Sequence, residues 1–149
     1  MDRLPPGRLV DEVTLPVERG KVREFVRATG ASDPVHVDAD AAAAAGFEAI
    51  PAPLTFSVST AHLRDQEAFV RALGLVRERI VVGSVSWEYS RPLLVGDELR
   101  AMRRVESDEL RAGRSGPMRF VTLATEFTDQ RGELVLVQRE VLIERAVAS

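Results

Sequence analysis

The sequence predicts a single α+β domain in which a mostly helical first half is followed by an antiparallel sheet. In residues 16–73 apolar side chains recur at the three- and four-residue spacing of helices. From residue 79 onward they alternate with polar ones, as in strands. Glycines and prolines stand between these stretches and mark their ends. An antiparallel sheet curled around a helix rich in small residues is an economical packing of such parts. We therefore expect about five strands wrapped around one central helix.

The composition is that of a globular protein and argues against several kinds of function. The 149 residues are enough for one domain, residues 1–149, with its own core. A net charge of −3 gives no electrostatic basis for nucleic-acid binding, and no stretch approaches the roughly 20 apolar residues of a membrane span. The absence of cysteine and the presence of only two histidines argue against a metal site. Because the start does not resemble a signal peptide, we expect a cytoplasmic protein.

Helical patterns account for most of the first half. Residues 9–15 alternate in part and predict a short edge strand, and residues 16–29 predict a helix that ends at Gly30. Residues 39–45 predict a short helix, and residues 52–73 the longer central one. The first half of the central helix carries small polar residues, which indicates burial under a sheet: Thr55, Ser57, Ser59 and Thr60.

Four long strands account for the second half. They are expected at residues 80–90, 98–105, 118–127 and 134–143, with the arginines of the second strand facing solvent. A Gly-rich, basic loop is expected at residues 111–117. Several strands carry apolar residues on both faces, which predicts that the sheet meets a helix on one side and a second subunit on the other.

The connector between the first two helices is the most informative stretch. Asp33-Pro34 favours a turn, because the Asp side chain can bond the backbone ahead and proline fixes its own φ. His36 follows within this rigid segment, and Asp38 is placed to cap the next helix. A functional His36 and one that only bonds a nearby carbonyl are equally consistent with the residues alone. His62, on the central helix, is interpreted as structural or surface.

Three motifs resemble one known family. The stretch GASDPVHVDADAAAAAGF, residues 30–47, is similar to the hydratase motif of the MaoC-like hot-dog enoyl-thioester hydratases and dehydratases. The stretch SRPLLVGDEL, residues 90–99, resembles a second family motif, and APLTF, residues 52–56, resembles the FAS1-like dehydratase branch. The resemblance implies a hot-dog fold, hydration of enoyl thioesters or dehydration of (R)-3-hydroxyacyl thioesters, and no cofactor.

The resemblance also implies the site residues. In the family an Asp and a His on this connector hold a water molecule, and His36 matches the family His. Ala31 stands at the usual Asp position, and Asp33, which is expected to hold the turn, is the remaining catalytic candidate. Backbone N–H groups at the start of the central helix bind the thioester oxygen in the family. Here the corresponding candidates are Pro53, Leu54, Thr55 and Phe56. Proline has no N–H, so Thr55 or Phe56 is expected to supply the donor.

Two functions from different classes remain open. The first is a working hydratase or dehydratase in which His36 is the acid–base residue. The second is a catalytically silent hot-dog subunit that pairs with an active MaoC-like partner and shapes its acyl tunnel. The partners implied are a coenzyme A or acyl carrier protein thioester and a second hot-dog chain, identical or different. A hot-dog thioesterase is less well supported, because residues 54–63 contain no carboxylate.

Basic residues suggest where the carrier of the thioester is held. Arg111, Arg114 and Arg119 are placed to meet its phosphates, and a solvated basic loop is the alternative.

Overall fold

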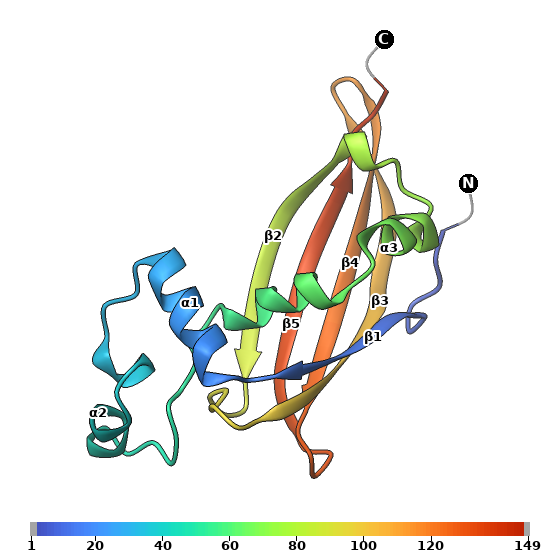
Figure 1. Ribbon diagram of the computed structural model, residues 1–149. Coiled ribbons are helices and arrows are strands. Elements are labelled where there is room, and N and C mark those ends of the chain that lie inside the picture. Colours follow the sequence, from blue (N-terminus) through green and yellow to red (C-terminus); the bar gives the residue numbers. More distant parts are fainter. Residues whose placement is uncertain (1–2, 148–149) are drawn as a thin grey trace.

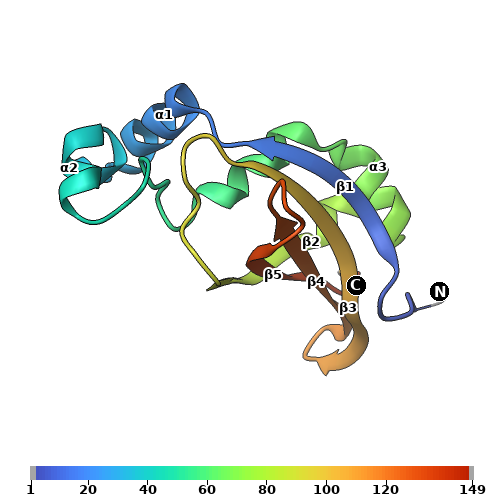
Figure 2. The ribbon, with the colours of Figure 1, turned by 90° about the horizontal axis from the view of Figure 1, so that it is seen from below.

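The computed structural model describes residues 3–147, in which one curled antiparallel sheet wraps around a helical segment (Figure 1, Figure 2). The strand order is β1-β3-β4-β5-β2, and every neighbouring pair is antiparallel. The strands are β1 (Leu9–Pro16), β2 (Ile80–Tyr89), β3 (Glu98–Gly113), β4 (Gly116–Thr128) and β5 (Leu134–Glu144). The helices are α1 (Arg19–Thr29), α2 (Ala39–Ala44) and α3 (Gln66–Leu73), with 3-10 helices η1 (Pro34–His36), η2 (Phe56–Leu63) and η3 (Arg77–Arg79). The α+β class and the hot-dog fold are confirmed.

The core lies between the concave face of the sheet and the segment η2–α3, which crosses that face in Figure 1. One cluster packs α1 and η2 against the sheet, with the rings of Phe25 and Phe56 edge to face at 5.5 Å. A second cluster packs Phe69 and Leu73 of α3 against β4. Within residues 3–147 no helix combines the length and the apolar character needed to cross a bilayer.

The prediction of one continuous central helix over residues 52–73 is wrong. The segment is a 3-10 helix, η2, followed by the α-helix α3, with a break at Arg64 and Asp65. The backbone of Arg64 is extended, at φ −103° and ψ 147°, and the Asp65 carboxylate caps α3 by accepting the N–H of Ala68 at 2.9 Å. A residue in an extended conformation cannot continue a helix, so the two halves are separate elements.

A buried ion cluster explains this break and corrects a second prediction. Arg103 of β3 faces inward and is 6% exposed, whereas the arginines of this strand were expected to face solvent. Arg103 and Arg64 both donate to the carboxylate of Asp11 in β1, and the Arg103 guanidinium lies 3.7 Å from the ring centroid of Phe69. Burial, together with the nearby Arg103, lowers the pKa of Arg64 to about 10. Arg64 is drawn inward by a partner 53 residues earlier in the chain.

Two boundaries also differ from the sequence expectation. The expected edge strand is confirmed as β1, which pairs with β3 and extends to Pro16, so the following helix begins only at Arg19. The basic loop expected at residues 111–117 is instead a hairpin whose turn is limited to Arg114 and Ser115. A register shift between Val105 and Ser107 lets β3 continue to Gly113 with its pairing to β4 intact.

The hairpin end contains a second buried ion pair. Arg119 donates to both oxygens of Asp108, at 2.9 and 2.6 Å, and to the carbonyl oxygen of Gly74. Burial opposes ionisation of Asp108, but these bonds and the N–H of Leu4 hold its pKa below the usual value. Because Arg119 is buried and 6% exposed, the expectation that it meets a phosphate at the surface is wrong.

Candidate functional site

The connector that carries His36 is fixed by caps at both ends. Helix α1 ends at Gly30, whose φ of 70° suits glycine, and the N–H of Ala31 closes the turn on the carbonyl oxygen of Val26 at 3.1 Å. The carboxylate of Asp33 accepts the N–H of Val35 at 3.1 Å and starts η1. Asp38 then caps α2, as the sequence predicts. The local sequence therefore sets the path of the backbone on either side of His36.

The ring of His36 is held in one orientation. Its Nδ1 lies 2.8 Å from the carbonyl oxygen of Pro51, and the side chain is half-buried. Because a carbonyl oxygen only accepts hydrogen bonds, Nδ1 carries the proton of the neutral ring. The lone pair is then on Nε2, which leaves Nε2 able to accept a proton from a substrate or a water molecule.

The start of the central segment is anchored beside this histidine. Pro51 forms an isolated bridge with Leu94, and the N–H of Ala52 donates to the carbonyl oxygen of Leu93 at 2.8 Å. The hydroxyl of Tyr89, at the end of β2, donates to the carbonyl oxygen of Leu54. Burial raises the pKa of Tyr89 to about 12, so this donor keeps its proton at neutral pH. These bonds place residues 51–54 at a fixed position next to His36.

Only one of the two proposed N–H donors is free at this point. The N–H of Phe56 donates to the carbonyl oxygen of Pro53 at 2.9 Å, so it is already used by the turn. Within the described chain the N–H of Thr55 has no backbone partner. Pro53 is buried, whereas the side chain of Leu54 is 67% exposed. Of Thr55 and Phe56, Thr55 is therefore the candidate for binding an oxygen atom.

The two residues closest to the family's Asp position supply no second acid–base group in contact with His36. The Asp33 carboxylate is exposed and engaged with Val35, and the structure gives it no hydrogen bond to the His36 ring. Ala31 is half-buried and packs against the core cluster around α1. The connector thus presents the His36 ring next to residues 51–54, and within residues 3–147 no carboxylate is bonded to this ring.

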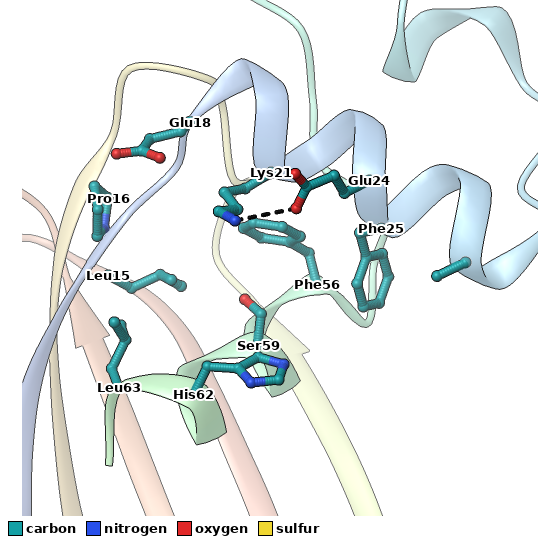
Figure 3. Close-up of a pocket in the computed structure, with 11 residues that line it drawn as sticks. Leu15, Pro16, Glu18, Lys21, Glu24, Phe25, Phe56, Ser59, His62 and Leu63 are labelled. Atoms are coloured by element: carbon teal, nitrogen blue, oxygen red, sulfur yellow. Dashed lines mark hydrogen bonds and ion pairs between the residues drawn. The ribbon is translucent and has the colours of Figure 1, made fainter.

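An apolar cavity lies beside η2 and was not predicted from the sequence. It has a volume of about 530 Å³ and lies between α1, η2 and the end of β1 (Figure 3). Phe25, Phe56 and Leu63 supply apolar walls, and His62 also lines it. His36 does not line this cavity. The cavity therefore adjoins the segment that starts beside His36 without containing the histidine.

Two serines of η2 have opposite hydrogen-bonding environments. Ser57 is buried, donates to Gln138 Oε1 at 2.6 Å and accepts from Trp87 Nε1 at 2.9 Å. The Oγ of Ser59, on the wall of the apolar cavity, is buried and has no partner within the described residues. The cluster of small polar residues in the sequence indicated burial, and it was the available signal for this site. Burial is confirmed for Ser57 and Thr60, whereas Thr55 is exposed.

Arg114 is not near His36. It lies in the β3–β4 turn, at the end of the sheet where β2 begins, whereas His36 lies by the residues that follow the end of β2 (Figure 1). Arg111 donates to Glu109 and lies over the ring of Phe120, at 4.4 Å from its centroid. The residues that the sequence proposes for one site therefore occupy two ends of the chain's sheet.

Comparison with known proteins gives a consistent set of similarities. The family model of the FAS1-like dehydratase domain region matches residues 6–138. A UPF0336 protein of Saccharopolyspora erythraea is 36% identical over 134 residues, which cover 89% of this chain and 83% of that protein. The crystal structure of the C-terminally truncated HadBC (3R-hydroxyacyl-ACP dehydratase) complex from Mycobacterium tuberculosis matches with a TM-score of 0.74 and 31% identity, over 88% of this chain and 90% of that chain. A structure described as a MaoC-like dehydratase matches with a TM-score of 0.78 and 28% identity, over 95% of this chain and 43% of that one.

The two serines provide a matched test of this local geometry. Ser57→Ala leaves Trp87 and Gln138 without their partner, so it should lower the free energy of unfolding by about 1–3 kcal/mol. Ser59→Ala removes a buried hydroxyl that has no partner and should raise the free energy of unfolding by about 1 kcal/mol. Urea unfolding of both variants measures the difference. Equal destabilisation by the two substitutions would contradict the assigned environments.

Proposed function

Because the chain belongs to the FAS1-like dehydratase domain family, a branch of the MaoC-like hot-dog hydratases and dehydratases, we propose that it hydrates enoyl thioesters or dehydrates (R)-3-hydroxyacyl thioesters. The substrate is carried on coenzyme A or an acyl carrier protein. The observation that carries the proposal is the His36 ring, whose Nδ1 is engaged with the Pro51 carbonyl and whose Nε2 is left as a base. Asp33 acts by holding the turn that positions this ring.

The chemistry needs one base and one hydrogen-bond donor. In hydration, Nε2 of His36 takes a proton from water while the water oxygen bonds to C3 of the enoyl thioester. Negative charge moves to the thioester oxygen, where the free N–H of Thr55 stabilises it. The imidazolium then returns a proton to C2, so the histidine ends unchanged. Dehydration runs through the same steps in reverse.

The apolar cavity has the character required for an acyl chain. Phe56 follows Thr55 directly and forms part of the cavity wall, so the tail of a thioester bound at Thr55 has a short path into it. A volume of about 530 Å³ is within the usual range of small-molecule sites, and the walls are mainly apolar. We assign this cavity to the acyl chain.

A specific observation favours the silent-subunit alternative. Ala31 stands where the family's Asp is expected, and among residues 3–147 no carboxylate is bonded to the His36 ring. The HadBC protein that resembles this chain is described as a complex. In this alternative the chain supplies the acyl cavity and a partner subunit supplies the acid–base pair.

We propose that in both functions a second hot-dog chain binds at β2. This strand is at the edge of the sheet, and near its start Val81 and Val82 are 39% and 57% exposed. An edge strand leaves backbone N–H and C=O groups unpaired, and a second chain can satisfy them by extending the sheet. At the other end of β2, the Tyr89 hydroxyl donates to the carbonyl oxygen of Leu54. This bond holds Leu54, whose side chain is exposed, next to the end of the strand. We assign β2 to the interface of an antiparallel, two-fold dimer.

His36→Ala should lower kcat by roughly 10²–10⁴-fold with crotonyl-CoA, because it removes the proton acceptor. The measurement is turnover of the assembled protein, with circular dichroism to confirm the fold. His62→Ala removes the other histidine of the chain and should leave kcat on this short substrate within a few-fold of the parent. Unchanged turnover in His36→Ala would exclude the proposed chemistry.

Ala31→Asp separates the two alternatives. If His36 works without a carboxylate, a new charge beside it should be neutral or harmful to turnover. If the chain is silent, Ala31→Asp restores the missing group and should create weak hydratase activity in the chain alone. Initial rates of parent and variant with crotonyl-CoA decide between them. High activity of the parent alone, lost in Ala31→Asp, rules out the silent subunit.

The assembly is tested by charging one sheet edge at a time. Val82→Lys places a charge in the β2 interface and should shift the dimer toward monomer, as read by light scattering at micromolar concentration. Leu9→Lys makes the same change at an exposed apolar residue of β1, on the opposite edge, and should leave the dimer intact. A parent protein that is monomeric alone and with any related subunit contradicts the assignment.

A further inference from the structure

Three arginines line a cavity at the end of the sheet opposite His36. The cavity has a volume of about 590 Å³, and Arg79, Arg114 and Arg145 contribute its charged side chains. Arg79 directly precedes β2, Arg114 is in the β3–β4 turn, and Arg145 directly follows β5. The N–H of Arg145 donates to the carbonyl oxygen of Arg79 at 2.9 Å, so the backbone holds these two residues together. Figure 1 shows this end of the sheet far from α1 and α2.

The cavity has more positive charge than its neighbours neutralise. Arg79 donates to the buried carboxylate of Glu144 at 3.0 Å, and this carboxylate also accepts the N–H of Val76. Within residues 3–147 neither Arg114 nor Arg145 forms an ion pair with a carboxylate, and both are exposed. The whole chain has a net charge of −3, so the excess of positive charge is local to this cavity and is not a property of the whole surface. Guanidinium groups bind phosphate strongly and can do so with two parallel hydrogen bonds.

We infer that this arginine cavity binds the phosphate of the phosphopantetheine arm that carries the thioester, and that it does so for the active site of the partner subunit. The inference rests on the proposed function for its ligand. It extends that function by placing the phosphate site and the reacting histidine of one catalytic unit on different chains.

The length of β2 is the reason for the second part of the inference. Arg79 stands at the start of β2, while Tyr89 at its other end holds the segment next to His36. Ten strand residues span about 33 Å, so the two groups of one chain are separated by nearly the length of the sheet. In an antiparallel pair of β2 strands, the start of one strand lies beside the end of the other. The arginine cavity of one chain is then at the same end of the dimer as the His36 of its partner.

Binding to the assembled protein tests the phosphate site. The double variant Arg114→Glu/Arg145→Glu should weaken coenzyme A by at least about tenfold in isothermal titration calorimetry, because it replaces attraction by repulsion. Its affinity for pantetheine, which lacks the phosphates, should stay unchanged. The matched control Arg8→Glu reverses the charge of an exposed arginine next to β1, at the opposite edge, and should leave both affinities unchanged. Unchanged binding of coenzyme A by the double variant would overturn the phosphate site.

Mixed dimers test which subunit the arginines serve. One chain carries His36→Ala and the other carries Arg114→Glu/Arg145→Glu, and the mixed dimer is purified through two different tags. If the cavity serves the partner, one of the two sites keeps both His36 and the arginines, so about half of the parent activity at limiting crotonyl-CoA should return. If the cavity serves its own chain, both sites are damaged and no activity returns. That second result overturns the assignment to the partner subunit.

Separate measurements identify the molecule that carries the phosphate and test the proposed function. A coenzyme A effect without an effect on a holo-acyl carrier protein identifies coenzyme A as the carrier, and an effect on both identifies the phosphate that the two carriers share. Calorimetry measures binding and does not depend on turnover. It therefore tests the phosphate site even if His36→Ala leaves activity unchanged and the proposed chemistry fails. In a silent chain paired with an active partner, the double variant should raise KM for the coenzyme A thioester of the complex by at least about tenfold, with kcat retained. An unchanged KM there would likewise overturn the inference.

Discussion

The buried cluster of Asp11, Arg64 and Arg103 determines how the central segment is arranged in this fold. It joins the edge strand β1, the neighbouring strand β3 and the point at which η2 gives way to α3. A buried charge is costly unless it is paired, so Arg64 must remain at Asp11 and the backbone must remain extended there. The position of η2 over the sheet, and with it the wall of the apolar cavity, depends on this contact.

The sequence predicted most of the sheet because alternation and turn residues are local signals. The break at Arg64 could not be predicted, since an arginine within a helical pattern ordinarily points to solvent. What turns it inward is a carboxylate far away in the sequence, which no local pattern reveals. Arg103 is a different case: its place in the alternation puts it on the inner face, and the expectation that it faces solvent followed from residue type alone. Its partner Asp11 lies 92 residues away in the sequence and was not predicted.

The candidate site divides in a similar way. The turn at Asp33, the cap at Asp38 and the position of His36 between them were readable, because each depends on neighbours within a few residues. The contact of His36 with Pro51, which sets the tautomer, joins residues 15 apart through a loop. It could not be predicted from the sequence. The apolar cavity forms only when α1 packs over η2, so the sequence suggested no more than the burial of the small polar residues of η2.

The winding of η2 determines which side chains line the apolar cavity. A 3-10 helix has three residues per turn, so side chains three apart eclipse one another. Phe56, Ser59 and His62 follow that spacing, and all three line the cavity as one straight ridge. In an α-helix each step of three residues rotates by about 300° instead of 360°, so the ridge would turn away by about 60° per step. The same amino acids would then show the cavity a different surface, so local rewinding alone, without any substitution, would change the shape of the cavity.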